Sequence, residues 1–227
     1  MDIDAIALLQ DPVRRRLYEY VVAQGREVGR NEAAEAAGVA RTLAAHHLDK
    51  LAGAGLLESG SRRLTGRSGP GAGRPAKVYT RARAEWSVSL PARDYLTAAE
   101  LLAEAAEGAG LDAGLCAAAR RRGEALRGPG APCGGLEEAM AVLAARGYEP
   151  HLEGVEGEGG GEGGLPVVRM RNCPFHAVAE RFPPLVCGMN LALLEGLLGT
   201  DGPVRARMDA RPGECCVVVE DSKNNID

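Results

Sequence analysis

The sequence lacks the features that mark secreted and membrane proteins. No apolar run in its 227 residues approaches the ~20 needed to cross a bilayer. The stretch from Met1 to Gln10 carries two aspartates and no basic residue, which is unlike a signal peptide. We therefore expect a cytoplasmic protein without a membrane partner, in a compartment where clustered cysteines bind metal or do redox work more often than they form structural disulfides.

The common phosphate-binding and nucleophile motifs are also missing. No G-x-G-x-x-G, P-loop or G-x-S-x-G segment occurs where a strand leads into a helix. The G-E-G-G-G-E-G-G loop at 157–164 has no lysine or hydroxyl group, and its acidic charge opposes phosphate. The sequence therefore predicts a protein that is not an enzyme.

Charge is distributed unevenly along the chain. Residues 1–83 carry 14 Lys+Arg against 9 Asp+Glu, whereas residues 84–227 carry 13 against 22. The excess is concentrated between Arg41 and Arg83, with nine basic and two acidic residues. A basic patch in a protein of net charge −4 predicts a local site for a polyanion such as DNA.

Helix signals surround this patch. Asp11-Pro12 predicts an N-cap and a first helical residue within an apolar pattern over 4–24. Gly38 predicts the end of a short helix capped by Asn31. A second helix is predicted from Arg41 to Ala52 or Gly53, with a buried face of Leu43, Leu48 and Leu51.

An arginine- and glycine-rich stretch, S-R-R-L-T-G-R-S-G-P-G-A-G-R-P, separates extended segments at Leu56–Glu58 and Lys77–Thr80. It predicts a hairpin tip, or wing, that contacts the DNA backbone. The basic residues expected to make these contacts are Arg62, Arg63, Arg67 and Arg74.

The phrase H-L-D-K-L-x-x-A-G-L-L-E resembles the winged helix-turn-helix of ArsR- and DeoR-like repressors, over roughly Asp4 to Arg81. The resemblance implies a double-stranded DNA operator as partner, with the second helix in the major groove. Arg41 is the candidate for a bidentate guanine contact, or for a phosphate contact alone. His47 is expected to pack inside. The residues of this helix expected to face DNA are Arg41, Thr42, Ala45, His46 and Lys50.

The rest of the chain predicts two further regions. Residues 84–132 are predicted to form a helical linker, with two Ala- and Leu-rich helices over 92–127. These helices are expected either to join two chains as a homodimer or to pack on the wing domain. The homodimer is favoured because such regulators bind two half-sites of an operator. Residues 128–132 read as a hinge. Residues 133–220 predict a small α+β domain with an antiparallel sheet and a broken helix over 175–199, and residues 221–227 a polar tail. The fold class is therefore α+β.

Four of the six cysteines lie in the last of these domains. Thirteen residues separate Cys173 from Cys187, and 27 separate Cys187 from Cys215. Thiolates bind iron–sulfur clusters, zinc or copper(I), so these three cysteines are predicted metal ligands. The last strand is predicted over 215–220, and side chains alternate between the two faces of a strand. Cys216 would therefore point to the face opposite Cys215, so it is an alternative ligand to Cys215. Candidate fourth ligands are His176, in Cys-x-x-His spacing with Cys173, and Cys133 of the hinge.

N-C-P-F-H at 172–176, a cysteine about fourteen residues later and a cysteine near the last strand resemble the C-terminal domain of SufR-type repressors. The resemblance implies a 4Fe–4S cluster at Cys173, Cys187 and Cys215 that controls the DNA affinity of a transcriptional repressor. Three alternatives stay open: a zinc site, a thiol switch without metal, and a regulator that binds an organic effector.

Overall fold

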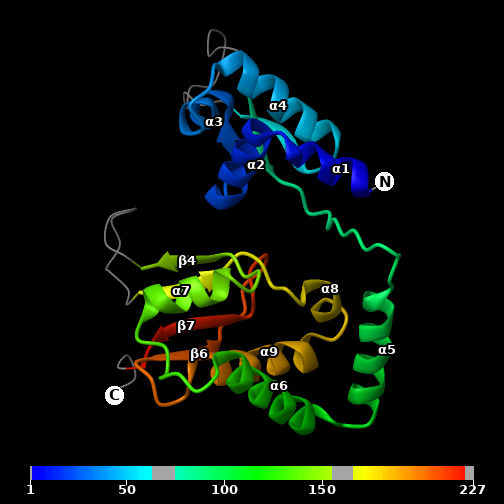
Figure 1. Ribbon diagram of the computed structural model, residues 1–227, viewed down its shortest axis with the longest axis vertical. Coiled ribbons are helices and arrows are strands. Elements are labelled where there is room, and N and C mark those ends of the chain that lie inside the picture. Colours follow the sequence, from blue (N-terminus) through cyan, green and yellow to red (C-terminus); the bar gives the residue numbers. More distant parts are fainter. Residues whose placement is uncertain (1, 63–74, 155–165, 223–227) are drawn as a thin grey trace. The chain divides into compact units, whose positions relative to one another are not determined.

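The computed structural model describes residues 2–62, 75–154 and 166–222 (Figure 1). The chain divides into two compact units, Met1–Arg93 and Asp94–Asp227. The predicted linker over 84–132 is thus not a unit of its own in the structure. Its two helices belong to the second unit, because the second of them packs along a later helix of that unit.

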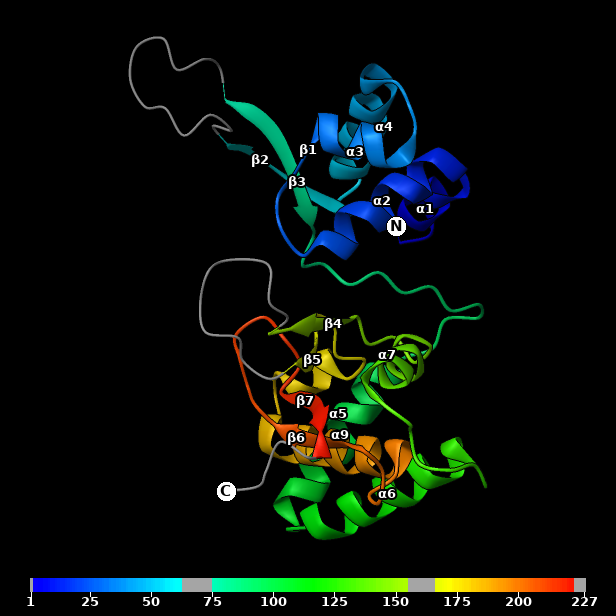
Figure 2. The ribbon, with the colours of Figure 1, turned by 90° about the vertical axis from the view of Figure 1, so that its left-hand side faces the viewer.

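The first unit consists of short helices followed by a hairpin. Its strands form an antiparallel sheet in the order β1-β3-β2, and Figure 2 shows them side by side. The elements are α1 (Asp2–Ala7), the 3-10 helix η1 (Leu8–Gln10), α2 (Pro12–Gln24), β1 (Val28–Gly29), α3 (Arg30–Ala37), α4 (Arg41–Gly53), β2 (Leu57–Arg62) and β3 (Ala76–Arg81).

Two of the three predicted helix boundary signals are confirmed. The Asp11 carboxylate accepts hydrogen bonds from the backbone N–H groups of Val13 and Arg14, at 2.9 and 3.0 Å, and caps α2. Gly38 ends α3 at φ +64°, a left-handed conformation that glycine adopts without strain. The Asn31 cap is wrong: Gly29 precedes α3, because β1 pairs with β3 up to that residue and leads directly into the helix.

The predicted buried face of α4 needs one correction. Leu48 and Leu51 are fully buried with Ala44, but Leu43 is 41% exposed. At 3.6 residues per turn, the face that Ala44, Leu48 and Leu51 share leaves Leu43 at its edge. Leu43 is therefore an apolar residue on the outer side of α4.

His47 is buried in the first unit, as predicted. The Arg14 guanidinium of α2 donates from Nε to His47 Nδ1 at 3.3 Å, and from Nη1 to the Leu8 carbonyl at 2.8 Å. Accepting a bond at Nδ1 requires the imidazole to be neutral there. Burial, and then the charge of Arg14, lower the pKa of His47 below its usual value, against the opposing charge of Asp11.

We expect the first unit to lose stability as the pH falls from about 7.5 to about 5.5. An unfolded histidine titrates near 6.5, whereas the folded pKa of His47 is lower. The unfolded chain therefore binds the proton first, and stability that is present above 6.5 is lost as the pH drops through the folded pKa. Urea unfolding followed by fluorescence of Trp86, the one tryptophan of the chain, measures this directly because Trp86 packs against the same core.

His47→Gln is the matched variant, since its amide stays neutral and its oxygen accepts from Arg14. In this variant the free energy of unfolding should depend less on pH over this range. The exposed His46 and the nearby Lys50 and Asp11 are the same in both proteins. An equal pH dependence in both proteins would assign the effect to another group.

The second unit is an α+β domain. Its four strands pair antiparallel in the order β4-β5-β7-β6, which confirms the predicted sheet type. The predicted break at Phe182-Pro183 is also confirmed, with Pro183 starting the longer helix. The elements are α5 (Tyr95–Gly108), α6 (Asp112–Arg127), α7 (Leu136–Ala144), β4 (Pro150–Glu153), β5 (Val167–Met170), α8 (His176–Ala179), α9 (Pro183–Leu198), β6 (Val204–Met208) and β7 (Val217–Asp221).

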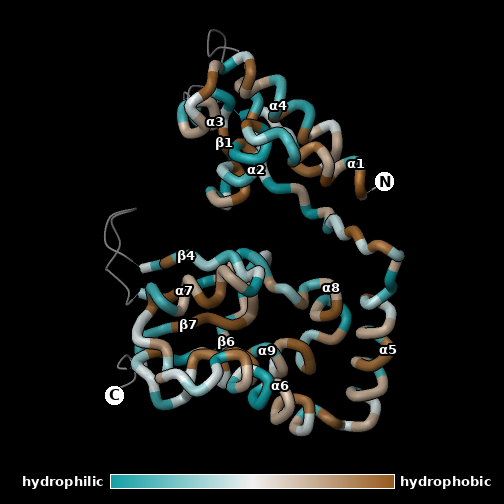
Figure 3. The backbone as a smooth tube through the Cα atoms, viewed as in Figure 1, coloured by the Kyte–Doolittle hydropathy of each residue, from teal (hydrophilic) through white to brown (hydrophobic). Residues whose placement is uncertain are grey.

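The two faces of this sheet differ in chemistry. Val168, Val217 and Val219 point into an apolar core that α7 and α9 share, and Figure 3 shows β7 as a hydrophobic strand. The opposite face carries Arg169, whose side chain is 2% exposed and bonds Glu153 and Asp209 at 2.6 Å each. These ion pairs attach the β6–β7 connection, which begins at Asp209, to β4 and β5.

Two glycines allow α6 and α9 to approach each other closely. A Cβ atom on Gly123 of α6 would overlap the Leu193 carbonyl, and one on Gly196 of α9 would overlap the Arg120 carbonyl. The backbones of the two helices therefore touch. The predicted hinge at 128–132 follows α6 within the same unit, and Pro132 packs against Gly199, so this segment does not connect the two units.

No helix in the described ranges is long and apolar enough to cross a membrane.

Candidate functional site

Helix α4 presents a polar face to solvent. Arg41, Thr42, His46 and Lys50 are exposed, and Ala45 is half-buried between them. The spacing of Thr42, His46 and Lys50 places these three residues on the side of α4 opposite Ala44, Leu48 and Leu51, while Arg41 is exposed as the first residue of the helix. Four of the five predicted helix residues are thus accessible, and three of them share one face of α4. Leu43, which was predicted to lie in the core, adds an exposed apolar group.

Strands β2 and β3 form the predicted hairpin, paired from Leu57↔Arg81 to Arg62↔Ala76. Arg62 is exposed at the end of β2, and its Nη1 lies 3.3 Å from Glu27 Oε2. The other three predicted wing residues, Arg63, Arg67 and Arg74, lie outside the described residues.

Asp49 joins α4 to the hairpin, and sequence reasoning missed it. Its carboxylate accepts from Lys77 Nζ and the Tyr79 hydroxyl of β3, and from Arg30 Nη2 of α3, each at 2.7 Å. Arg30 also donates from Nε to the Tyr79 hydroxyl at 2.9 Å. Partial burial raises the pKa of Asp49, but these three hydrogen bonds outweigh it and lower the pKa to about 2. The carboxylate therefore stays ionised at any physiological pH.

The four C-terminal cysteines come from three segments of the second unit. Cys173 lies in the turn between β5 and α8, and Cys187 in the first half of α9. Cys215 and Cys216 end the β6–β7 connection. Cys215 is buried at 3% exposure, and the other three are half-buried.

These four thiols meet in one group. Cys215 shares side-chain hydrogen bonds with Cys173 and with Cys216, and Cys216 shares another with Cys187. We call these four residues the thiol cluster. The structure thus brings together the three predicted ligands and also Cys216.

Cys216 reaches the cluster because β7 begins later than predicted. A strand that began at residue 215, as predicted, would turn the side chains of Cys215 and Cys216 to opposite faces. The strand runs from Val217 to Asp221, so strand alternation does not apply to the cysteine pair. Backbone bonds from Cys215 N to the Met170 carbonyl, at 2.9 Å, and from Asp209 N to the Cys216 carbonyl, at 2.8 Å, fix the two residues ahead of the strand. The structure therefore places both Cys215 and Cys216 in the thiol cluster, and which of them binds a metal stays a prediction.

Cys215 is the hydrogen-bond acceptor of the thiol cluster. Hydrogen bonds from the Cys173 and Cys216 thiols, and from the Val217 N–H and Asn190, lower the pKa of Cys215 despite its burial. The same bonds to the Cys215 sulfur, followed by burial, raise the pKa values of Cys173 and Cys216, which act as donors. One thiolate surrounded by donors is the arrangement that this geometry favours.

The two other candidate ligands, His176 and Cys133, have partners outside the thiol cluster, and Cys116 was not a predicted ligand. His176 is 57% exposed, and its Nε2 lies 3.3 Å from Glu180. The Cys133 thiol donates to the Gly135 carbonyl at 3.5 Å. Cys116 lies on α6 against Gly188.

No three His, Cys, Asp or Glu side chains in the described part of the chain are arranged to hold a metal ion as they stand. The cysteine sulfurs are engaged with one another instead. Since only deprotonated sulfur binds metal, a metal ion or cluster would replace these thiol–thiol hydrogen bonds.

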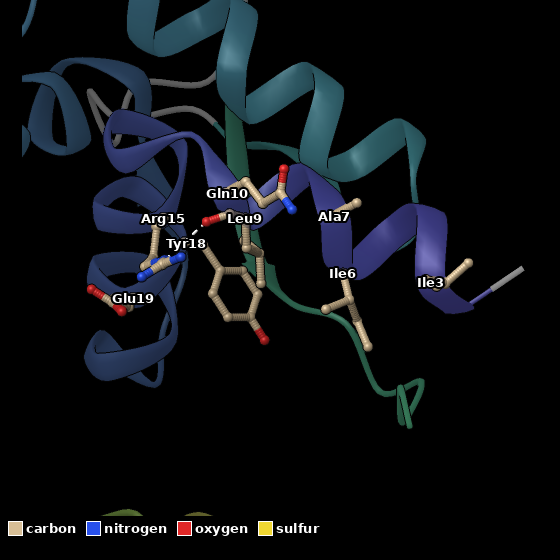
Figure 4. A pocket seen from close by; sticks show the side chains of 8 residues that line it. All are labelled: Ile3, Ile6, Ala7, Leu9, Gln10, Arg15, Tyr18 and Glu19. Carbon is tan, nitrogen blue, oxygen red and sulfur yellow. Dashed lines mark hydrogen bonds between the residues drawn. The ribbon is translucent and has the colours of Figure 1, made fainter. Parts of the chain in front are cut away.

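An open hollow of ≈ 560 Å³ lies on the first unit (Figure 4). It is formed by α1, η1 and the start of α2, where Arg15 donates to the Leu9 carbonyl at 2.8 Å. It includes none of the predicted site residues. Its lining consists of Ile3, Ile6, Ala7, Leu9, Gln10, Arg15, Tyr18 and Glu19.

Comparison with known proteins identifies part of the first unit. A family model described as a helix-turn-helix domain matches residues 8–60, the range from η1 into β2. Searches among curated proteins and solved structures found no match. The chain therefore contains a helix-turn-helix domain, which indicates a DNA-binding regulator. The finer ArsR-, DeoR- and SufR-type resemblances stay predictions.

Proposed function

We propose that the protein is a transcriptional regulator that binds operator DNA through α4 and the β2–β3 hairpin, and whose affinity is set by an iron–sulfur cluster held by the thiol cluster. The observation that carries this proposal is the meeting of four cysteines from three segments in a chain that also has a helix-turn-helix domain. Four cysteines are a common ligand set for a 4Fe–4S cluster.

The residues fit such a group by their chemistry. Cys173, Cys187, Cys215 and Cys216 would hold it, so the fourth ligand is a cysteine and His176 is not needed. A bound 4Fe–4S cluster supplies one-electron redox chemistry and sensitivity to oxidants. Cys215 is buried, whereas Cys173, Cys187 and Cys216 are half-buried, so a group held by these residues would be partly accessible from solvent.

Binding by all four cysteines would join the β5–α8 turn, α9 and the β6–β7 connection. Because α9 touches α6 along the Gly123–Gly196 contact, a change at Cys187 is passed to α6 and on to α5, the helix that begins the second unit. Since coupling is reciprocal, DNA binding must change cluster stability by the same factor.

We propose further that the protein acts as a homodimer, with α5 in the interface. Only Ala103 of this helix is buried, while Tyr95 and Leu102 are each 72% exposed and Leu101 is 62% exposed. Hydrophobic residues along α5 are visible in Figure 3. An apolar surface of this kind on an isolated chain is typical of a protein–protein contact.

The first experiment is iron, sulfide and zinc analysis of anaerobically purified protein, with its visible spectrum and its DNA affinity before and after chelation. About four irons and four sulfides per chain, with a cluster-dependent affinity, support the proposal. Protein that binds DNA but takes up no iron or sulfide on reconstitution contradicts the cluster and leaves the helix-turn-helix function.

Zinc is the second candidate. The direct thiol–thiol contacts favour it, because four sulfurs around one zinc ion, each at about 2.3 Å, remain close to one another. One zinc ion per chain, with no sulfide, would support a zinc site in place of the iron–sulfur cluster. A metal-free protein whose DNA affinity follows thiol oxidation would instead select the thiol switch.

The DNA surface has its own prediction. Replacing Arg41, Lys50 and Arg62 by alanine should reduce the slope of log affinity against log salt by roughly three for each protomer on the DNA, since about one counterion is released per phosphate contact. Fluorescence anisotropy with labelled DNA at several salt concentrations measures the slope. The matched control is Arg121→Ala with Arg122→Ala, two exposed arginines of α6, which should leave the slope unchanged. Equal slopes in the wild type and the triple variant would mean that DNA does not bind to the surface that contains these three residues.

A further inference from the structure

Asn190 is a buried amide in an otherwise apolar helix. It lies one turn after Cys187 on α9, with 0% of its surface exposed, and its buried neighbours on that helix include Val186 and Leu194. Burying an amide without hydrogen-bond partners costs several kcal/mol, so the hydrogen bonds of Asn190 are important for its place in the core. Both bonds lead to residues far away in the sequence.

One of these bonds ends on a cluster sulfur. Asn190 Nδ2 donates to Cys215 Sγ at 3.4 Å, and the Tyr148 hydroxyl donates to Asn190 Oδ1 at 2.6 Å. Tyr148 is 3% exposed, and its hydroxyl can give its proton to the amide oxygen but not to the amide nitrogen. Donation by Tyr148 to Oδ1 and acceptance by the Cys215 sulfur from Nδ2 together hold the amide with its N–H facing the sulfur.

We propose that Asn190, oriented by Tyr148, is a positioning residue whose N–H···S bond to Cys215 sets the stability and reduction potential of the group that the thiol cluster holds. This inference rests on the proposed iron–sulfur function. A hydrogen bond to a ligand sulfur stabilises negative charge, so it favours the reduced cluster and raises the potential. Replacing a residue that hydrogen-bonds to a metal ligand commonly lowers metal affinity about 10- to 100-fold.

The test compares wild type with two variants after anaerobic reconstitution with iron and sulfide. Asn190→Leu removes the N–H donor at similar volume. Tyr148→Phe combined with Asn190→Leu removes the donor and also the hydroxyl that would lose its partner, which keeps the core apolar and folded. Both variants should show a lower midpoint potential and about 10- to 100-fold faster cluster loss to a chelator.

Tyr148→Phe alone should shift the potential in the same direction by less, because Asn190 keeps its N–H but loses its fixed orientation. Met189→Leu, a change of similar volume on the same helix, is the control for packing and should leave the potential unchanged. A potential in the double variant equal to that of wild type would overturn the inference while leaving the iron–sulfur function intact.

The reduced, metal-free protein gives an independent measurement. Alkylation of Cys215 by iodoacetamide near pH 6, followed by peptide mass spectrometry, should be several-fold slower in Asn190→Leu, because less of the thiol is ionised without its donor. Equal alkylation rates would show that Asn190 does not act on this sulfur. A wild type that takes up no iron and sulfide would overturn the proposed function, and the alkylation rates would still decide whether Asn190 acts on Cys215.

Discussion

Gly196→Ala is expected to destabilise the second unit by at least about 3 kcal/mol, the upper part of the range for overpacked cores. The new Cβ would overlap the Arg120 carbonyl and lie 3.0 Å from the backbone nitrogen of Glu124. Both atoms belong to the backbone of α6, so no side-chain rotation relieves the clash, and the two helices must separate. Because α9 carries Cys187, we expect the variant to lose cluster binding along with stability. Thermal unfolding by circular dichroism and the iron content after reconstitution measure the two effects.

Gly188→Ala is the matched control on the same helix. Its Cβ would lie 3.7 Å from Cys116 Sγ, an ordinary contact distance, so only the better helix propensity of alanine remains. That propensity stabilises by up to about 1 kcal/mol. Equal unfolding temperatures for the Gly196→Ala and Gly188→Ala proteins would mean that α6 and α9 do not touch through their backbones in solution.

Cys215→Ala is expected to abolish cluster uptake and any dependence of DNA affinity on the cluster. Cys215 is the acceptor for two other thiols, so its loss removes a ligand and leaves Cys173 and Cys216 without their shared partner. DNA binding through α4 should persist, because the substitution lies outside the helix-turn-helix domain. Iron and sulfide analysis, together with DNA titrations of the same samples, check both outcomes.

Cys116→Ala is the control for cysteine removal in general, since Cys116 lies on α6 outside the thiol cluster. It should take up the same iron and sulfide as wild type. Cluster-dependent DNA affinity that survives Cys215→Ala would exclude this thiol cluster as the regulatory site.

The features that could be predicted from the sequence depend on short-range chemistry. Asp11-Pro12, Gly38 and the Pro183-Pro184 pair set helix ends by their own backbone and capping preferences. A run of valines between polar residues was enough to predict the last strand, though not its first residue. The thiol site is an exception: it was predicted from the type of residue, although Cys173 and Cys215 are 42 residues apart.

The missed features depend on contacts between distant residues. The start of β7 is fixed by its pairing with β5 and β6, which decided the position of Cys216. Tyr148 and Asn190 are 42 residues apart, and no local pattern links them. Residues 92–127 had helical patterns, but the partner of α6 is revealed only by Gly123 and Gly196 meeting across two helices.

The Asp49 carboxylate has a consequence for how regulation can reach DNA. It bonds α3 and β3 to α4, so these contacts oppose a movement of the helix against the hairpin within the first unit. A signal from the thiol cluster cannot tilt the helix against the hairpin without breaking these bonds. If the protein is the regulated dimer proposed above, we therefore expect the regulated quantity to be the separation of the two half-sites, while the preferred bases within each half-site stay the same.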